Sequence, residues 1–446
     1  MKITIIGTGH VGLVTGAVFA EKGHDVLCID NNQAKINMLK KGEMPFYEPG
    51  MEALVVKNFQ AGRLKFDTEI ANGVAFAPVI FIAVGTPPLP TGEPDLTYIE
   101  KVSRGIAVAL KEYRVIVEKS TVPVNTGEKV FRTLKRYAPK HVTYDVASNP
   151  EFLREGQGVE DGLNPDRIVI GVPSPQAEQL LREVYQKFAV PLIVTDVNSA
   201  EMIKHAANAF LAMKISFINS VANICELAGA NVVEVARGIG SDKRIGPQFL
   251  KAGVGYGGSC FPKDVDAFVQ IADSLGYNFG LLKEVQRVNK EQRVRFLKKI
   301  QKELWVIKDK NIAVLGVAFK PDTDDMREAP ALDIIAELKK RGAKLKVYDP
   351  EAFKAVRDIL AAPLSEDAYE RQVAETMQGV MLCKNVEEAM TGAECLLLMT
   401  EWKEFCVLTA DKIKALMAYP LVIDGRNLFD PKEMERQGVI YRSVGR

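Results

Sequence analysis

Short apolar runs alternate with amphipathic stretches over the first 196 residues. The chain opens with the apolar run "MKITIIG", continues with "HVGLVTGAVFAEKG", where apolar residues recur at helical spacing, and returns to an apolar run at "HDVLCID". This pattern predicts a strand, a helix and a second strand. Further apolar runs predict strands in "APVIFIAVGTP", "RVIVEKSTVPV", "VTYDVASNPEF" and "RIVIGV". Strands that alternate with helices favour an α/β fold with a doubly wound parallel sheet.

A different pattern follows "LIVTD". The segment from Asn198 to about residue 230 contains no proline, and its apolar positions recur every three or four residues. This spacing predicts one long helix that connects domains. Asn198 with Glu201 three residues later is typical of a helix start. Lys204 and Asn208 are four residues apart, so they share one face of the helix. We expect helical segments to continue to about residue 306, interrupted by one glycine-rich loop.

A second α/β pattern begins near residue 307. A strand in "NIAVLG", a helix in "EAPALDIIAELKKRG" and a strand that ends at Asp349 repeat the first arrangement, and "ECLLLMT" and "PLVIDGR" predict two more strands. The sequence therefore predicts two Rossmann-like doubly wound parallel-sheet domains, joined by the long central helix and a helical domain. We expect the domain boundaries at 1–196, 197–306 and 307–446.

The first strand leads into a glycine motif, Gly7-x-Gly9-x-x-Gly12, which opens the first helix. In this context the first glycine allows a tight turn, the second lets the backbone approach a pyrophosphate, and the third lets the helix pack on the strand. Asp30 ends the second strand, where an acid can accept hydrogen bonds from a ribose diol. Two asparagines follow it, so no arginine is placed for a 2′-phosphate. We therefore predict that the first domain binds NAD rather than NADP.

The matching turn of the second α/β pattern lacks this motif. Gly316 is followed by Val317 and Ala318, and larger side chains follow where bare backbone is needed. This domain is expected to keep the dinucleotide fold without a dinucleotide site. The cations at its strand ends suit a phosphate-bearing ligand, with solvated surface charge as the alternative for each: Lys320, Arg327 and Arg426.

Composition narrows the class of protein. Hydrophobic residues make up 47% of the chain and charged residues 26%, and Lys plus Arg number 58 against 57 for Asp plus Glu. The basic residues are dispersed, which argues against nucleic acid or a membrane as a partner.

The sequence also gives expectations about targeting. Charges soon interrupt the N-terminal apolar run, so we expect no export signal, and no apolar stretch of about 18 residues predicts a membrane span. The six cysteines form no CxxC pair and are expected to be reduced in the cytoplasm. The four histidines lack the spacing of metal ligands.

Cys260 lies in the loop "GYGGSCFPKD", behind three glycines and a serine. A thiol that serves only packing has little to pack against there, whereas glycines allow a substrate to approach closely and nearby cations favour a thiolate. Cys260 is therefore a candidate nucleophile, and a buried packing cysteine is the alternative. Thr86, Thr121 and Glu151 stand in loops after predicted strands, where open α/β sheets bind ligands. Each of the three is equally consistent with a solvated loop position.

Eight segments follow one another along essentially the whole chain: "GTGHVGLVTGAVFAEKGHDV", "VGTPPLPTGEPDL", "EKSTVPVNTG", "NPEFLREG", "EMIKHAANAFLAMKISFINSVANICE", "RIGPQFLKAGVGYGGSCFPKD", "FKPDTDDMREAP" and "DGRNLFD". In this order they resemble the UDP-glucose branch of the nucleotide-sugar 6-dehydrogenase family. The resemblance implies an N-terminal NAD domain, a helical middle that forms a homodimer or higher homo-oligomer, and a C-terminal domain for the UDP end. It also implies a four-electron oxidation of UDP-glucose at C6 to UDP-glucuronate, with two NAD reduced.

The resemblance also implies roles for single residues. Cys260 would carry a thiohemiacetal and a thioester, and the other implied catalytic residues are Lys204, Asn208, Asp264, Thr121 and Glu151. The implied cofactor contacts are Gly7, Gly9, His10, Val11, Gly12, Asp30, Lys35, Thr86, Thr121, Glu155, Lys263 and Arg327. The implied substrate contacts are Glu151, Phe152, Leu153, Lys204, Asn208, Arg244, Phe249, Leu250, Gly257, Phe261, Phe319, Lys320 and Arg426. Arg244 would reach the nucleotide sugar of the neighbouring subunit, which implies an obligate dimer.

The sequence leaves three alternative functions open. The same chemistry on GDP-mannose or UDP-N-acetylmannosamine is the nearest alternative. A single-step NAD-dependent hydroxyacid dehydrogenase also joins an NAD domain to a long helix, but it gives Cys260 no role. A catalytically silent nucleotide-sugar binding protein is the third alternative, and Cys260, Lys204 and Asp264 argue against it.

Overall fold

The computed structural model describes residues 1–87, 89, 93–362, 365 and 367–446. Positions 88 and 90–92 of the segment "VGTPPLPTGEPDL" therefore lie outside the described residues. The chain forms two compact units: unit 1 comprises Met1–Ala207 and Asp266–Tyr277, and unit 2 comprises Asn208–Val265 and Asn278–Arg446. The segment 197–306, which is expected to form one domain, is divided between the two units. The three expected domain boundaries therefore stay a prediction.

An eight-stranded sheet forms the centre of unit 1, in the order β3-β2-β1-β4-β5-β6-β7-β8. β7 pairs antiparallel with β6, whereas the other neighbours are parallel. The sequence did not predict the two edge strands β3 and β8. Each has only four residues, and neither is buried along its whole length as a central strand is. The strands are β1 (Lys2–Ile6), β2 (Asp25–Ile29), β3 (Leu64–Asp67), β4 (Val79–Ile82), β5 (Arg114–Glu118), β6 (Tyr144–Ser148), β7 (Ile168–Gly171) and β8 (Leu192–Thr195).

Alternate residues of these strands face two separate hydrophobic cores. Val79 and Phe81 join a core with α1, α2, α3 and α8, whereas Ile80 and Ile82 join another with α4, α5 and α6. Helices therefore cover both faces of the sheet, as the apolar runs predicted. The helices are α1 (His10–Glu21), α2 (Gln33–Lys40), α3 (Met51–Gln60), α4 (Ile70–Phe76), α5 (Thr97–Ala109), α6 (Thr126–Tyr137), α7 (Gly158–Leu163) and α8 (Pro175–Tyr185).

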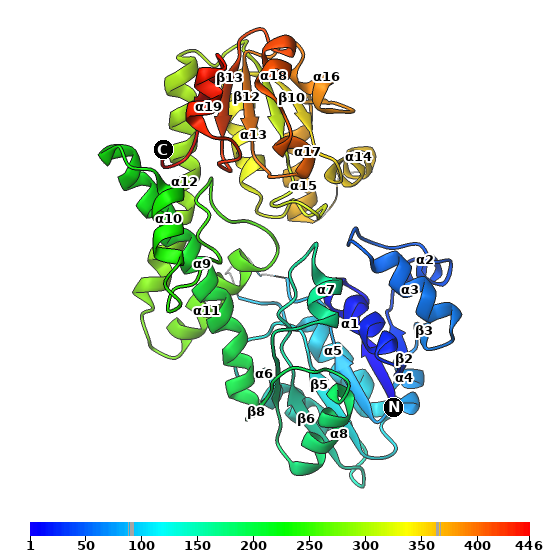
Figure 1. Cartoon of the computed structure of the whole chain (residues 1–446). Helices are drawn as coiled ribbons and strands as arrows, with labels where there is room; N and C mark the ends of the chain where they lie inside the picture. The colour runs from blue at the N-terminus through cyan, green and yellow to red at the C-terminus, as the bar shows by residue number, and fades with distance from the viewer. Residues whose placement is uncertain (88, 90–92, 363–364, 366) are drawn as a thin grey trace. The chain divides into compact units, whose positions relative to one another are not determined.

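The predicted connector is the single long helix α9 (Val197–Ala228), drawn in green in Figure 1. Its predicted start was wrong by a few residues. Asp196 rather than Asn198 accepts hydrogen bonds at the first turn, from the Ser199 amide at 2.8 Å and the Ser199 hydroxyl at 2.6 Å. Glu201 does not fold back on its own helix but accepts hydrogen bonds at the start of α6. The Asn198–Glu201 spacing therefore lies at a helix start, but Glu201 binds another helix instead of capping its own.

α9 is also long and apolar enough to cross a membrane by length and composition, with a window of mean hydropathy 1.3 of which 33% is buried. This differs from the expectation that no such apolar stretch exists. Core helices pass the same test. The N-terminal part of α9 buries Glu201, Lys204, His205 and Asn208, and each of these side chains hydrogen-bonds to another part of its own unit.

Unit 2 is built on a six-stranded parallel sheet in the order β11-β10-β9-β12-β13-β14. The short edge strands β11 and β14 were not predicted. The strands are β9 (Asn311–Leu315), β10 (Lys344–Tyr348), β11 (Met381–Leu382), β12 (Cys395–Leu398), β13 (Leu421–Asp424) and β14 (Ile440–Arg442). The helices are α10 (Val232–Gly240), α12 (Gly280–Leu304), α13 (Pro330–Lys340), α14 (Ala352–Ala361), α15 (Ala368–Met377), α16 (Val386–Met390), α17 (Lys403–Cys406), α18 (Ala410–Leu416) and α19 (Pro431–Arg436). α11 (Phe261–Ser274) begins in unit 2 and ends in unit 1.

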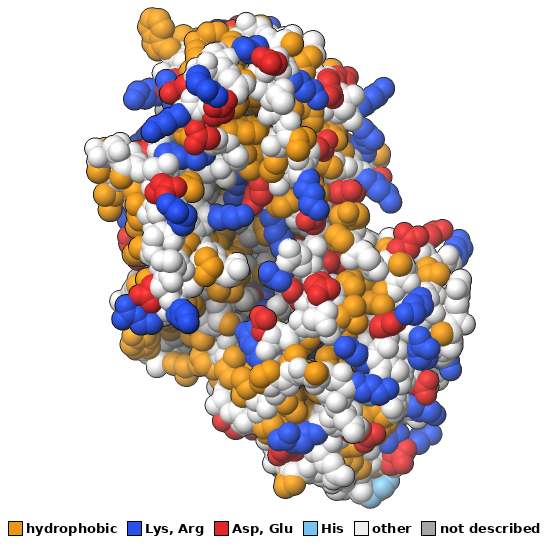
Figure 2. All heavy atoms as spheres, in the orientation of Figure 1, with side chains coloured by type: hydrophobic (Ala, Val, Ile, Leu, Met, Phe, Trp, Pro, Cys, Tyr) orange, Lys and Arg blue, Asp and Glu red, His pale blue; other side chains and the backbone are white. Residues whose placement is uncertain are grey.

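On the face of the molecule shown in Figure 2, Lys and Arg side chains are interspersed with Asp and Glu. This distribution fits the formal net charge of +1. A surface of this kind offers no extended field to attract a polyanion.

Candidate functional site

The glycine motif forms the turn between β1 and α1. Gly7 has φ +104°, and a Cβ on Gly7 would lie 2.4 Å from the Ala83 carbonyl oxygen. A Cβ on Gly12 would lie 1.9 Å from the Gly7 oxygen, whereas no described atom lies within 4 Å of a Cβ on Gly9. No described side chain caps α1 at Gly9. The open space at Gly9 and the uncapped start of α1 fit a pyrophosphate, so the predicted cofactor turn, which includes Val11, suits NAD.

Asp30 stands at the end of β2 and faces this turn. Its Oδ2 accepts hydrogen bonds from the Thr8 amide at 3.0 Å and the Thr8 hydroxyl at 2.6 Å, and Lys35 Nζ lies 3.3 Å away. Burial alone would raise the pKa of Asp30, but the hydrogen bonds from Thr8 and Asn32 lower it below its usual value. The acid is therefore ionised and can accept a hydrogen bond from a ribose hydroxyl. Lys35, a predicted cofactor contact, is ion-paired with this acid.

His10 is tied to a loop that the sequence did not single out. Glu48 Oε2 lies 3.1 Å from His10 Nε2, and Glu48 also accepts hydrogen bonds from the amides of Gly156 at 2.8 Å and Gly158 at 2.7 Å. Burial would lower the pKa of His10, but Glu48 and the nearby charge of Glu155 raise it overall. Glu48 thus holds the residue 155–158 loop beside the cofactor turn. The only sequence signal was an acid inside the turn-forming run "PFYEPG".

The loops after β4, β5 and β6 bring several predicted residues together in unit 1. The Thr86 hydroxyl donates to the Thr121 carbonyl at 2.9 Å. Lys204 Nζ donates to Glu151 Oε1 at 2.8 Å, and both side chains are buried. The other Glu151 oxygen accepts a hydrogen bond from the Leu153 amide at 2.6 Å. Lys204 Nζ also lies 5.6 Å from the centre of the Phe152 ring. Lys204 is therefore buried in an ion pair rather than exposed to solvent.

Three further ionisable residues are buried close to these loops: Glu118, Lys119 and Glu201. Burial raises the pKa of Glu118 to about 8 and that of Glu201 to about 7. Burial lowers the pKa of Lys119 to about 8, against the attraction of Glu151. Glu201 accepts the Asn125 amide at 2.7 Å and the Gly127 amide at 2.8 Å, and so joins α9 to the start of α6. The sequence singled out Glu201 only as part of a helix start, and it gave no reason to select Glu118 or Lys119.

Unit 2 holds the remaining catalytic candidates around the start of α11. Cys260 immediately precedes this helix and is partly buried. The N-terminal end of a helix carries partial positive charge, which favours a thiolate beside it. The sequence carried a signal for this helix start, since proline and Asp264 both lie in its first turn. Asn208 donates to Asp264 Oδ2 at 2.6 Å, and Lys263 donates to Asp264 Oδ1 at 2.7 Å.

The glycines before Cys260 make room for the protein itself. A Cβ on Gly257 would lie 2.3 Å from the Glu328 carbonyl oxygen, and one on Gly258, where φ is +86°, would lie 2.7 Å from the Phe319 ring. These glycines let the loop pass tightly against Glu328 and Phe319 within unit 2, and the approach of a substrate to this loop stays a prediction.

Other predicted substrate residues surround this loop or lie apart from it. Phe261 contacts Phe249, with ring centres 6.0 Å apart, and Leu250 is buried. Arg244 has an 88% exposed side chain that pairs with Asp242, two residues away. The structure thus places Arg244 at the surface of unit 2.

The C-terminal cations are each engaged with unit 2. Arg426 donates to the Phe319 carbonyl at 3.1 Å and to the Met399 carbonyl at 2.7 Å. Lys320 Nζ lies 5.4 Å from the centre of the Phe319 ring. Arg327 is half exposed and pairs with Asp325 at 2.8 Å. Phe319 and two of the three cations therefore form one cluster at the end of the sheet.

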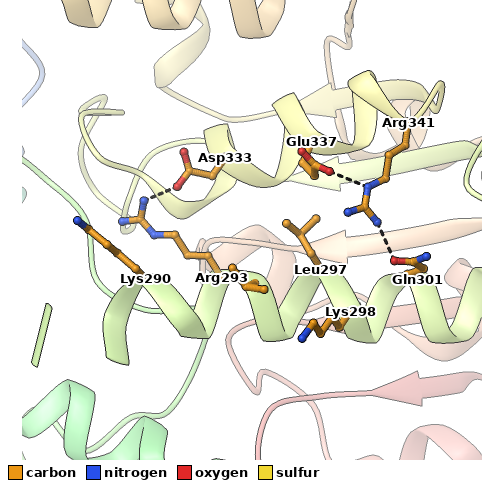
Figure 3. A pocket seen from close by; sticks show the side chains of 9 residues that line it. Lys290, Arg293, Leu297, Lys298, Gln301, Asp333, Glu337 and Arg341 are labelled. Carbon is orange, nitrogen blue, oxygen red and sulfur yellow. Dashed lines mark hydrogen bonds and ion pairs between the residues drawn. The ribbon is translucent and has the colours of Figure 1, made fainter. Parts of the chain in front are cut away.

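A groove of about 600 Å³ lies between α12 and α13, and no predicted site residue lines it (Figure 3). Arg293 on α12 pairs with Asp333 on α13, and Arg341 pairs with Glu337 at 2.8 Å. Of the four cations that line the groove, two are thus paired with its two carboxylates.

Three parts of the chain match consecutive domains of one protein family. Residues 1–189 match the NAD binding domain, residues 198–291 the central domain and residues 313–431 the UDP binding domain of the UDP-glucose/GDP-mannose dehydrogenase family.

Relatives are similar over the full length of the chain. The UDP-glucose 6-dehydrogenase TuaD of Bacillus subtilis is 47% identical over 445 residues, which cover 100% of this chain and 93% of TuaD. A UDP-glucose 6-dehydrogenase of Rhizobium meliloti is 44% identical over 453 residues, with both chains fully covered. The solved structure of a UDP-glucose dehydrogenase from Pyrobaculum islandicum has a TM-score of 0.90 at 35% identity and covers 100% of this chain and 97% of its own.

Proposed function

The chain belongs to the UDP-glucose/GDP-mannose dehydrogenase family, and we propose that it oxidises UDP-glucose to UDP-glucuronate through a covalent intermediate on Cys260. The NAD domain would hold the hydride acceptor that both oxidations at the sugar C6 require. The observation that carries the proposal is the position of Cys260 directly before α11. A dehydrogenase that stops at the aldehyde needs no nucleophile there.

The first oxidation needs an acceptor for the hydroxyl proton and a group that stabilises the developing alkoxide. Asn208 and Lys263 both donate to Asp264, and these contacts hold its carboxyl group in place to take the proton through a water molecule. Lys204, one helical turn before Asn208 on α9, supplies the positive charge for the alkoxide. Its ion pair with Glu151 holds the ammonium group in place.

The second oxidation needs the thiolate. The Cys260 sulfur forms a C–S bond to the aldehyde carbon, and the carbonyl oxygen takes up a proton to give a thiohemiacetal. Loss of a hydride and of the hydroxyl proton leaves a thioester. Water then forms a C–O bond to the thioester carbon, the C–S bond breaks, and the thiolate is restored. Glu151 takes the proton of the attacking water, and Thr121 helps to hold this water.

The sugar and the stoichiometry can be tested together. The purified protein is incubated with NAD and UDP-glucose, GDP-mannose or UDP-N-acetylmannosamine, and NADH is counted per sugar consumed. We expect two NADH per UDP-glucose and little reaction with the other two sugars. One NADH per sugar would indicate a single-step dehydrogenase, and none with any sugar would indicate a binding protein.

Cys260→Ala separates the two oxidations. This variant is expected to give at most about one NADH per UDP-glucose, because the alcohol step does not use the sulfur but the thioester route does. Iodoacetamide should label Cys260 in the parent enzyme, and UDP-glucose should protect it. Cys406 is the exposed competitor for this label, although burial and nearby carboxylates raise its pKa. Two NADH per sugar from Cys260→Ala at the parental rate would contradict the covalent route.

We also propose that the enzyme is a homodimer or a higher homo-oligomer. Phe210, Phe217 and Ile224 on α9 are 58%, 56% and 63% exposed. They are seven residues apart, so they lie on one face of the helix. An apolar stripe of this kind favours burial against a second chain. Sedimentation at assay concentration should find no active monomer.

Arg244 is proposed to complete the site of the neighbouring subunit. Its side chain is exposed and pairs only locally among the described residues. Two variants that each lack the complete two-hydride reaction, Arg244→Ala and Cys260→Ala, should restore it when they are refolded or exchanged together, because one hybrid site then contains both groups. No restoration in verified hybrids would place Arg244 in its own chain's site.

The expected division into 1–196, 197–306 and 307–446 remains our proposal for the domains, and it is supported by family matches that end and begin near these positions. We also propose that the enzyme works in the cytoplasm. All six cysteines are free thiols in the structure, which suits a reducing compartment.

A further inference from the structure

The segment before Cys260 is buried without being helix or strand. Residues 252–258 are all buried and have no regular secondary structure. Buried backbone amides and carbonyls need hydrogen-bond partners, and an irregular segment cannot supply them to itself. Two partners are backbone groups, because the Val254 amide donates to the Gly425 carbonyl at 3.1 Å and the Gly258 amide donates to the Arg327 carbonyl at 2.8 Å.

Side chains of α12 supply further partners. Asn289, Gln292 and Arg293 lie at positions i, i+3 and i+4, so they share one face of the helix. Gln292 Nε2 donates to the Gly253 carbonyl at 3.0 Å. Asn289 is 5% exposed, and both ends of its amide contact one residue: Oδ1 accepts the Tyr256 amide at 2.9 Å and Nδ2 donates to the Tyr256 carbonyl at 3.1 Å.

Arg293 adds a second donor to the same carbonyl. Its Nη2 lies 3.2 Å from the Tyr256 oxygen and 3.1 Å from the Glu328 oxygen. The other side of the guanidinium pairs with Asp333, as Figure 3 shows. The planar fork of arginine suits this bridging position. Tyr256 is therefore held by three side-chain hydrogen bonds from α12.

The sequence of the loop is adapted to Asn289. A Cβ on Gly255 would lie 2.6 Å from Asn289 Oδ1, and Gly255 has φ +104°. Any larger residue at position 255 would push the amide away from Tyr256. Four residues after Tyr256 the chain reaches Cys260, and Gly257 and Gly258 between them have no side chains of their own to fix the path.

We propose that Asn289, assisted by Arg293, is a positioning residue for the Cys260 thiolate. This inference rests on the proposed function, in which Cys260 attacks the aldehyde. Attack requires the sulfur at bonding distance from a carbon, and a misplacement of about 1 Å can slow such a step on the order of a hundredfold. Asn289 does not touch the substrate in this account. It fixes the Tyr256 peptide and thereby the start of the short segment that ends in the nucleophile.

The test measures the rates of the two oxidations separately in the Asn289→Ala variant. The UDP-sugar 6-aldehyde is supplied as the substrate for the second oxidation, and UDP-glucose in a single turnover reports the first hydride. We expect aldehyde oxidation to fall at least about tenfold, because both hydrogen bonds to Tyr256 are lost. The first hydride should fall less than about threefold, because it does not use the sulfur. Equal losses in the two steps would overturn the proposal.

Two further variants guard against a merely structural effect. Asn58→Ala removes another fully buried amide, one that donates to Glu21 and to the Leu54 carbonyl in unit 1. It should lower the melting temperature but leave the ratio of the two rates unchanged. Asn289→Asp keeps the acceptor for the Tyr256 amide and should give an intermediate loss of aldehyde oxidation. This loss should shrink at lower pH, where a protonated carboxyl again donates to the Tyr256 carbonyl.

A double-mutant comparison provides the decisive control. In the Cys260→Ala background, adding Asn289→Ala should cause no further change in the yield of NADH per sugar. A further loss in that background would show that Asn289 acts on the first oxidation and would overturn the proposal. If the parent enzyme itself gives fewer than two NADH per sugar, the proposed function fails first. If the parent gives two and Asn289→Ala oxidises the aldehyde at the parental rate, only the positioning role fails.

Discussion

In both α/β sheets an acid accepts a hydrogen bond from the amide that follows the first glycine of the turn, but the second partner of each acid differs. In unit 1, Asp30 at the end of β2 accepts hydrogen bonds from the Thr8 amide and hydroxyl. In unit 2, Asp349 directly after β10 accepts hydrogen bonds from the Val317 amide at 2.7 Å and the Ala318 amide at 3.0 Å. The carboxylate of unit 2 thus binds the backbone that would otherwise face a pyrophosphate.

The surroundings of the two acids deepen this difference. Asp30 is partly exposed, whereas Asp349 is 1% exposed and also accepts the indole N–H of Trp402 at 3.3 Å. The first glycine is needed in both turns, since Gly7 and Gly316 both have positive φ and tight neighbours. A Rossmann-like turn therefore binds NAD only when the positions after its first glycine leave space and the acid stays accessible.

The largest effect is expected from filling the first turn. Gly12→Val should abolish measurable NAD binding, a loss of at least about 100-fold, because its side chain would collide with the Gly7 carbonyl and displace the turn. Gly316→Val should instead lower the melting temperature, because overpacking against Thr400 costs about 1–3 kcal/mol. NAD affinity is measured by titration calorimetry on folded protein. Parental NAD affinity in Gly12→Val would refute the assignment of the first turn.

A smaller effect is expected from removing each acid. Asp30→Ala should weaken NAD about 10- to 100-fold, because hydrogen bonds to a charged acceptor contribute about 1.5–3 kcal/mol. It should also reduce discrimination against NADP, since no carboxylate then faces the 2′-phosphate. Asp349→Ala should leave NAD affinity unchanged and lower the thermal stability of unit 2, because two backbone amides lose their buried acceptor. Equal catalytic efficiency of the parent with NAD and NADP would contradict this comparison.

The smallest effect concerns pH. The folded-state pKa values of Glu201 and Glu118, about 7 and about 8, lie above the unfolded value of 4.5. The folded state therefore binds more protons between pH 4.5 and 8, so their contribution to the free energy of unfolding is complete below pH 4.5 and is lost as pH rises through 7 and 8. Glu118→Gln should flatten this decline and raise the melting temperature most at pH 8. An unchanged pH dependence would show that Glu118 is ionised in the fold.

The α/β pattern of both units could be predicted from sequence because buried strands form continuous apolar runs and the glycine motif has a fixed place after the first strand. The edge strands β3, β8, β11 and β14 could not, because they are short or only half buried. The catalytic candidates came from residue type, helical spacing and the family resemblance.

The partners of those candidates required the structure. Glu48 and Asn289 stand far in sequence from the residues they hold, and nothing in their local pattern marks them. Glu201 shows the same limit, since its spacing from Asn198 indicated a cap, whereas its carboxylate accepts amides more than 70 residues away. Tertiary contacts of this kind leave no short-range sequence signal.

The central claim is that one chain binds one NAD and that this site lies in unit 1. Titration calorimetry of the parent, Asp30→Ala and Asp349→Ala with NAD counts sites and measures affinity in one experiment. We predict one site per chain in the parent, the same site at parental affinity in Asp349→Ala, and a clear loss of affinity in Asp30→Ala. Two sites per chain, or loss of NAD binding from folded Asp349→Ala alone, would contradict the account.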